Sequence, residues 1–241
     1  MPRFFCDLPL SLGISVALPP AVAHHVFVLR MQVGETLQLF NGSGGCYVAS
    51  LTALDKKQAT AVLKLFLPEE VELAHALNLV QALPEGNKMD WIMEKAVELG
   101  VTALQPLATQ RCVVRLSAER AEKKMAHWQG VLIAAAEQCG RNRLPHLAAP
   151  LDLSKWLAQQ DIHPRIMLSP RAELSLTDWV KHRPPQALSL LIGPEGGLSD
   201  AEEDLAVRHG VIALSMGPRI LRTETAGLTA VAAINAIWGS F

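Results

Sequence analysis

The chain has 241 residues, of which half are hydrophobic and 19% are charged. This length and composition allow one large domain or two ordinary domains with buried cores, and they exclude a mainly disordered chain. The formal net charge is −1, so any nucleic-acid surface must come from local clusters of basic residues.

Targeting and cysteine patterns favour a cytoplasmic protein. No apolar run approaches 18 residues free of charge or proline, so no membrane span is expected. Residues 8–23 are apolar and end in Ala-Val-Ala, which resembles a signal-peptidase site, but Asp7 precedes the run and prolines interrupt it. No cysteine lies in a C-x-x-C pair or near a histidine at metal spacing, so reduced cysteines and no metal site are expected. The four cysteines are Cys6, Cys46, Cys112 and Cys139.

The first 72 residues are expected to form a small β-barrel, because short apolar strands follow one another at close spacing. The expected elements are strands at 14–18, 36–40, 46–54 and 59–67, with a short helix at 20–30. Five basic residues against six acidic ones mean that this region is not a basic patch overall.

Residues 68–70 are the expected linker to a second domain at 73–241. A helix at 88–99 has its apolar residues at helical spacing, and Gly100 ends it. The other elements expected before residue 184 are strands at 73–83, 101–107 and 165–168, a helix at 117–139, an irregular stretch with a short helix at 146–157, and a weak helix at 174–180.

Residues 111–143 carry the strongest local excess of positive charge, with seven basic residues against three acidic ones. Such a cluster suits contacts to the phosphate backbone of a nucleic acid. The ordinary alternative is a set of solvated charges on and after a helix.

The rest of the chain is organised around residues 188–226. Two apolar runs, 188–192 and 211–215, each lead into a turn that contains glycine. A helix is expected between them, with Ser199 as its N-cap, Glu202 as the capping-box partner and Gly210 as the stop. A last helix is expected to begin at Thr223. Alternating strands and helices indicate a parallel α/β sheet, whose ligands bind beyond the carboxyl ends of the strands.

Several ligands could occupy a slot between the two glycine turns. The first turn lacks the Gly-Lys-Ser/Thr ending of a phosphate-binding P-loop, and the carboxylate of Glu195 would repel a phosphate. No G-x-G-x-x-G fingerprint occurs, which weakens a dinucleotide site. A neutral or cationic ligand fits better. The alternative is that these glycines only terminate strands.

The runs GPEGG and MGPRILRTETA, with EKAVELGV and AAEQCGR upstream, resemble the signature of the SPOUT methyltransferases. Within them the chain resembles the RsmE family, which methylates N3 of a uridine in bacterial 16S ribosomal RNA. The resemblance covers essentially the whole chain. It implies an α/β domain with a trefoil-knotted parallel sheet, preceded by a PUA-like or OB-like RNA-binding barrel at 1–72. It also implies S-adenosylmethionine as cofactor, the small ribosomal subunit as partner, and a homodimer.

Residue roles follow from the motifs and the resemblance together. The expected cofactor-binding residues are Leu168, Ser169, Ile192, Gly193, Glu195, Gly196, Gly197, Leu214, Met216, Gly217, Ile220, Leu221 and Thr225. The expected catalytic residues are Arg222, Glu224 and Arg141, where the arginines would stabilise charge on the uracil or hold a phosphate. The expected RNA contacts are Arg3, His24, Arg30, Lys88, Arg111, Arg115 and Arg143. His24 can equally be an ordinary histidine.

Three other functions stay open at this point. The chain could methylate another RNA nucleotide, or it could be an RNA-binding module with an inactive knot domain. It could also be a nucleotide-binding Rossmann enzyme, although its glycine fingerprint is missing.

Overall fold

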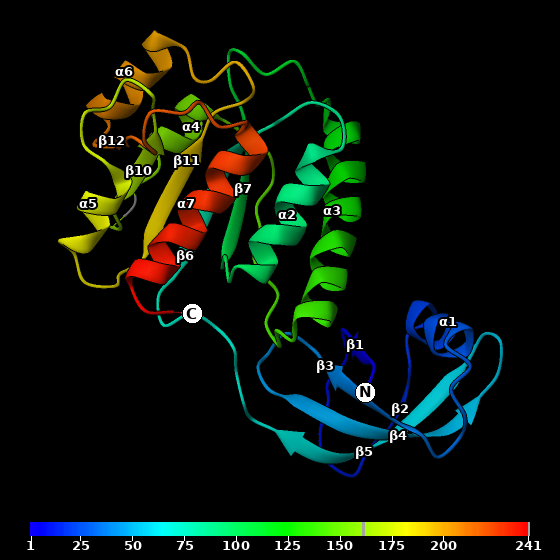
Figure 1. Cartoon of the computed structure of the whole chain (residues 1–241). Helices are drawn as coiled ribbons and strands as arrows, with labels where there is room; N and C mark the ends of the chain where they lie inside the picture. Colours follow the sequence, from blue (N-terminus) through cyan, green and yellow to red (C-terminus); the bar gives the residue numbers. More distant parts are fainter. Residues whose placement is uncertain (161, 241) are drawn as a thin grey trace. The chain divides into compact units, whose positions relative to one another are not determined.

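The computed structural model describes residues 1–160 and 162–240, and the chain forms two compact units (Figure 1). The first unit comprises residues 1–72 together with 133–144. The second comprises residues 73–132 and the chain from residue 145 onward. The expected first domain ended at residue 72, so the grouping of 133–144 with it is a difference from the sequence-based expectation.

The first unit is built on a five-stranded sheet with the order β1-β3-β4-β5-β2. β3, β4, β5 and β2 pair antiparallel, whereas β1 pairs parallel with β3. The elements are β1 (Arg3–Phe5), β2 (Ser15–Ala17), α1 (Pro20–Val28), β3 (Thr36–Phe40), β4 (Cys46–Leu54) and β5 (Ala59–Leu67). β1 was not expected, because its three residues are too few to show a period of two.

Helix α1 ends two residues earlier than expected. Arg30 adopts a left-handed conformation with φ 57°. The Arg30 and Met31 amides donate to the carbonyls of Phe27 and Val26 at 3.0 and 3.3 Å. These two bonds close the helix as a Schellman motif does, with arginine at the position where glycine is usual.

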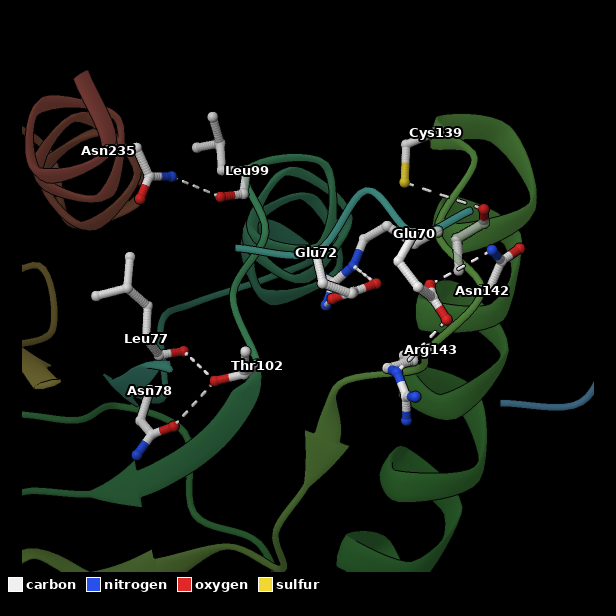
Figure 2. A network of polar contacts seen from close by, with 12 residues as sticks. Glu70, Glu72, Leu77, Asn78, Leu99, Thr102, Cys139, Asn142, Arg143 and Asn235 are labelled. Carbon is white, nitrogen blue, oxygen red and sulfur yellow. Dashed lines mark hydrogen bonds and ion pairs between the residues drawn. The ribbon is translucent and has the colours of Figure 1, made fainter. Parts of the chain in front are cut away.

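Polar contacts hold segment 133–144 within the first unit. The Glu137 carboxylate accepts the Phe5 amide at 2.8 Å. Asn142 accepts from the Arg3 guanidinium at 2.8 Å and donates to the Glu69 carbonyl at 2.8 Å. Figure 2 shows Asn142 beside Glu70. Burial raises the pKa of Glu137 although the hydrogen bond from the Phe5 amide acts in the opposite direction. A buried carboxylate is costly to leave unpaired, so this hydrogen bond helps to hold the segment in place.

The second unit is built on a sheet in which every strand pairing is parallel. The strand order is β12-β10-β11-β6-β7-β8, and β9 also pairs with β7. The strands are β6 (Leu77–Ala82), β7 (Ala103–Ala108), β8 (His146–Leu147), β9 (Leu151–Asp152), β10 (Arg165–Leu168), β11 (Leu188–Ile192) and β12 (Ile212–Leu214). β8 and β9 were not expected, because two residues leave no pattern. Near the start of β6, the Asn78 side-chain oxygen accepts a hydrogen bond from the Thr102 hydroxyl at 3.3 Å (Figure 2).

Helices cover both faces of this sheet, as parallel strands require. Helix α7 lies over one face of the sheet (Figure 1), where Gly227 packs closely against Leu79 and Ile192. Val80 and Leu191 point to the other face, into a core with α4 and α6. The helices are α2 (Lys88–Glu98), α3 (Ala118–Cys139), α4 (Leu153–Leu157), α5 (Leu176–Lys181), α6 (Asp200–Arg208) and α7 (Thr223–Ile237). Within the described residues, no helix is long and apolar enough to cross a membrane.

We expect acid to destabilise the second unit through His75. This ring is buried edge-on against the Trp238 ring, with centroids 4.7 Å apart. Burial, partly offset by the Asn235 side chain, lowers the pKa of His75 below its ordinary 6.5. The unfolded chain therefore binds this proton more readily, and the free energy of unfolding should fall as pH drops through about 6.5. His75→Phe should flatten that dependence in urea titrations between pH 8 and 5. An unchanged slope would contradict this assignment.

Candidate functional site

One cavity of the second unit lies beyond the carboxyl ends of three adjacent strands. β10 ends at Leu168, β11 at Ile192, and β12 leads through Ser215 to Met216, and all three ends reach the same cavity of about 250 Å³. This volume is close to the lower end of the ~300–1,000 Å³ typical of small-molecule sites. Ligands bind at this edge in parallel α/β sheets, so the fold places the cavity where a ligand is expected.

Two glycine loops form the walls of the cavity. We call residues 193–198 the first glycine loop and residues 215–222 the second. The expected cofactor-binding residues all line the cavity except Leu214 and Thr225. The lining residues that sequence reasoning missed are Pro170, Pro194, Leu198, Glu203, Arg219, Thr223 and Ala226.

The two exceptions have simple geometric causes. Leu214 is fully buried within β12. Its carbonyl accepts the amide of Ser169, a residue that lines the cavity, at 2.9 Å, so Leu214 acts behind the cavity wall. Thr225 is exposed on α7, whereas Thr223 and Ala226 line the cavity. Residues three apart share a helix face, so the helical period from Thr223 would have indicated Ala226 instead of Thr225.

Close backbone packing requires glycine at the start of the first glycine loop. A Cβ on Gly193 would lie 2.9 Å from the Leu198 amide nitrogen. The Gly197 amide donates to the Pro194 carbonyl at 2.9 Å, and Gly197 has φ +68°. The loop is therefore a tight turn whose backbone lies directly on the cavity.

Two hydrogen bonds of the buried Thr223 hydroxyl connect this loop, the last helix and β6. The Thr223 hydroxyl donates to the Gly193 carbonyl at 2.6 Å. The same hydroxyl accepts from the side-chain amide of Gln81, a fully buried residue of β6, at 2.9 Å. Thr223 thereby fixes both the loop and the first turn of α7 at the cavity wall.

The charge of Glu195 is compensated within the unit. Its carboxylate accepts from the Lys88 ammonium and from the Glu85 amide. Partial burial disfavours the Glu195 anion, but these hydrogen bonds outweigh it and hold its pKa below the ordinary value. The bond to Glu195 likewise raises the pKa of Lys88. Lys88, expected to contact RNA, is thus an anchor of the first glycine loop.

The Glu203 carboxylate, in the first half of α6, also lines the cavity. Its Oε2 accepts from the Ser169 hydroxyl at 2.9 Å and lies 3.7 Å from Arg171. The helix starts at the expected place, because Ser199 and Glu202 form the expected capping box. A partly buried carboxylate here favours ligands with cationic or hydroxyl groups over polyanions.

Two of the expected catalytic residues lie at the start of α7, next to the cavity-lining Thr223. Arg222 is the N-cap residue of α7 and its side chain is exposed. Glu224 is in the first turn, and its Oε2 is buried without a hydrogen-bond partner. A buried carboxylate oxygen without a donor is costly, so Glu224 is the carboxylate here with unused acceptor capacity.

The third expected catalytic residue, Arg141, belongs to the first unit. Its guanidinium is almost fully buried and forms an ion pair with the Glu72 carboxylate. The expectation of a basic surface over 111–143 is therefore wrong at Arg141, because this side chain is not at the surface. Its catalytic role stays a prediction.

The expected RNA contacts differ in how much of their hydrogen-bonding capacity is used. His24, Arg30, Arg115 and Arg143 are exposed. Arg115 donates to the Gln110 carbonyl at 3.3 Å, and Arg143 lies 3.6 Å from Glu70.

Arg3 and Arg111 are engaged more firmly. Arg3 donates to Gln38 and Asn142 and stacks over the Phe40 ring at 5.0 Å. Arg111 donates to two carbonyls of the first glycine loop.

The cavity suits an organic ligand with hydroxyl or ammonium groups, such as S-adenosylmethionine. Its glycine loops present backbone groups, and Glu203 supplies an acceptor for a hydroxyl or ammonium. Residues 1–160 and 162–240 contain no group of three or more His, Cys, Asp or Glu side chains that could hold a metal ion.

Comparison with known proteins agrees with this site. Residues 71–235 match the family described as RNA methyltransferase domain, and residues 18–64 match the RNA methyltransferase PUA domain. The family models thus identify an RNA methyltransferase domain, built on the parallel sheet, joined to an RNA methyltransferase PUA domain. The threading of a trefoil knot stays a prediction.

Full-length relatives give the particular family. Ribosomal RNA small subunit methyltransferase E of Bacillus subtilis is 33% identical, over 98% of this chain and 96% of the relative. The Synechocystis protein of the same name is 36% identical, over 92% and 73%. A crystal structure of that enzyme from Neisseria gonorrhoeae, bound to S-adenosyl methionine, is 39% identical with a TM-score of 0.93, over 99% and 98%. The chain belongs to the ribosomal RNA small subunit methyltransferase E family.

Close packing makes Gly193 and Gly196 a matched pair for a stability test. A Cβ at Gly193 meets backbone, whereas one at Gly196 meets only the Arg111 side chain, at 3.4 Å or more. Gly193→Ala should lower the free energy of unfolding by about 1–3 kcal/mol, because backbone cannot move aside cheaply. Gly196→Ala should change it by no more than about 0.5 kcal/mol. Urea titrations measure both, and equal effects would contradict the packing argument.

Proposed function

We propose that this protein transfers a methyl group from S-adenosylmethionine to N3 of a uridine in small-subunit (16S) ribosomal RNA, forming 3-methyluridine. The observation that carries the proposal is the cavity walled by two glycine loops at the carboxyl edge of the parallel sheet. It occurs in a chain that matches, over 99% of its length, a family member whose crystal structure holds S-adenosyl methionine.

The cavity residues have distinct tasks toward the cofactor. When bound, S-adenosylmethionine supplies a methyl group on a sulfonium and leaves as S-adenosylhomocysteine. The first glycine loop presents backbone groups to it, and Gly193 permits the close backbone packing that shapes this loop. Glu203 accepts a hydrogen bond from an ammonium or hydroxyl of the ligand. Tight positioning matters most, because in-line displacement depends on alignment of donor and acceptor.

The acceptor nitrogen needs help from the protein, because N3 of uracil carries a proton and is a poor nucleophile until that proton leaves. We assign Arg222 to stabilise the negative charge that then develops on the uracil oxygens. Glu224 is the candidate that takes the proton, since its buried Oε2 has no donor. A uridine paired in a duplex hides N3, so the target nucleotide must be unpaired or flipped out.

The PUA-like unit is assigned to RNA binding. Its exposed candidates are His24, Arg30 and Arg143, and Arg115 adds a basic side chain in the second unit. These residues would contact phosphates, which fix position but carry no sequence information. We further propose a small ribosomal subunit particle as the substrate and the cytoplasm as the place of action.

We also propose that the enzyme works as a homodimer. Ile220, at the rim of the cavity, is 79% exposed. A second copy with twofold symmetry would cover such a rim and could complete the site. Light scattering should give twice the mass of one 26.1 kDa chain.

The decisive test is transfer of labelled methyl from S-adenosylmethionine to small-subunit particles, followed by nucleoside analysis. 3-methyluridine would support cofactor, substrate class and target atom together. Another methylated nucleoside would retain the enzyme class and change the target. Cofactor binding without transfer to particles or free ribosomal RNA would favour an inactive knot domain.

Arg222→Ala should separate catalysis from cofactor binding. Removal of a group that stabilises developing charge should lower kcat by about a hundredfold or more, while the Kd for the cofactor stays within about twofold. Single-turnover transfer and calorimetry measure the two quantities. The exposed Arg208 of α6 provides the control, and Arg208→Ala should leave kcat unchanged. Normal turnover in Arg222→Ala would remove Arg222 from the mechanism.

A further inference from the structure

The side chain of Arg111 reaches across to the first glycine loop from the segment between β7 and α3. Its Nη1 donates to the Gly196 carbonyl at 2.8 Å and to the Leu198 carbonyl at 3.1 Å. A Cβ on Gly196 would lie 3.4 Å from Arg111 Cδ, so the aliphatic stem lies along the loop as well. A single arginine therefore holds the second half of the loop, residues 196–198, which leads into α6.

The other half of the loop has anchors of its own. Thr223 holds the Gly193 carbonyl, and Lys88 holds the Glu195 side chain. Among the described residues, Arg111 alone donates side-chain hydrogen bonds to the Gly196 and Leu198 carbonyls. The same segment makes one further tie, because the Gln110 amide donates to Glu202 of the capping box at 2.7 Å.

We propose that Arg111 is a positioning residue for the cofactor site, which holds the first glycine loop in its ligand-ready shape. The identity of the ligand rests on the proposed function, but the role in shaping the loop does not. Without Arg111 the loop would sample more conformations, and binding would have to pay for ordering it. Preorganisation of this kind affects ligand affinity more than the chemistry at N3.

This role differs from the RNA contact expected from the charge of Arg111. A phosphate contact would make RNA affinity depend on Arg111 and would leave the loop unaffected. A positioning role predicts the opposite pattern. Arg115, four residues later, bonds only to the Gln110 carbonyl of its own segment and does not touch the loop. It is therefore a matched control of equal charge.

Arg111→Met tests the proposal, because methionine keeps an aliphatic stem and removes the donors. We expect the Kd for S-adenosylmethionine, measured by calorimetry, to rise about tenfold, in line with loss of charged hydrogen bonds. The KM for the cofactor should rise while kcat at saturating cofactor stays near the wild-type value. The cofactor Kd of Arg111→Lys should lie between those of wild type and Arg111→Met, because an ammonium retains the charge but has no planar fork of donors. Arg115→Met should leave the cofactor Kd unchanged.

Hydrogen exchange of the ligand-free protein gives a readout that needs no cofactor. Backbone amides of residue 193 and residues 195–198 should exchange faster in Arg111→Met than in wild type, and at the wild-type rate in Arg115→Met. Wild-type exchange and wild-type cofactor Kd in Arg111→Met would overturn the proposal. A drop in RNA affinity with an unchanged Kd would make Arg111 an RNA contact instead. If wild-type protein fails to bind the cofactor, the proposed function fails, and the exchange comparison still decides the role of Arg111.

Discussion

The first glycine loop is the constraint on which the site depends. Its backbone folds back so closely at Gly193 that no side chain fits, and a turn this tight leaves its carbonyls to be held from outside. Thr223 of α7 and Arg111 of the segment before α3 hold loop carbonyls, and Lys88 of α2 holds the Glu195 carboxylate. Because these anchors come from three separate segments, the loop takes its shape only when the whole second unit has folded.

The electrostatics of the cavity follow from the same anchors. Glu195 would place a negative charge beside the loop, but Lys88 neutralises it and turns the pair into a structural tie. Glu203, a second carboxylate that lines the cavity, accepts a hydrogen bond from the Ser169 hydroxyl. The cavity therefore has an acceptor for cationic or hydroxyl groups, while the exposed Arg222 lies at the start of α7.

Local patterns were enough for most of the fold. The expected bounds of β3, β4, β5, β10 and β11 agree with the structure residue for residue, and so does the capping box of α6, because period and cap chemistry are encoded in neighbouring residues. β1, β8 and β9 escaped notice, because two or three residues carry no period. The place of segment 133–144 in the first unit also escaped notice, because its partners Phe5, Glu69 and Glu72 lie far away in sequence.

For the site, the sequence by itself determined the two glycine loops and hence most of the cavity-lining residues, since strand ends and glycines are local features. It also determined the family, through runs such as GPEGG. Only the tertiary structure decided the partners of the charged residues. Arg141 pairs with Glu72, Lys88 with Glu195, and Arg111 with loop carbonyls. The physical reason is that a charge in a sequence shows only that a partner is needed, whereas folding brings together the distant group that becomes that partner.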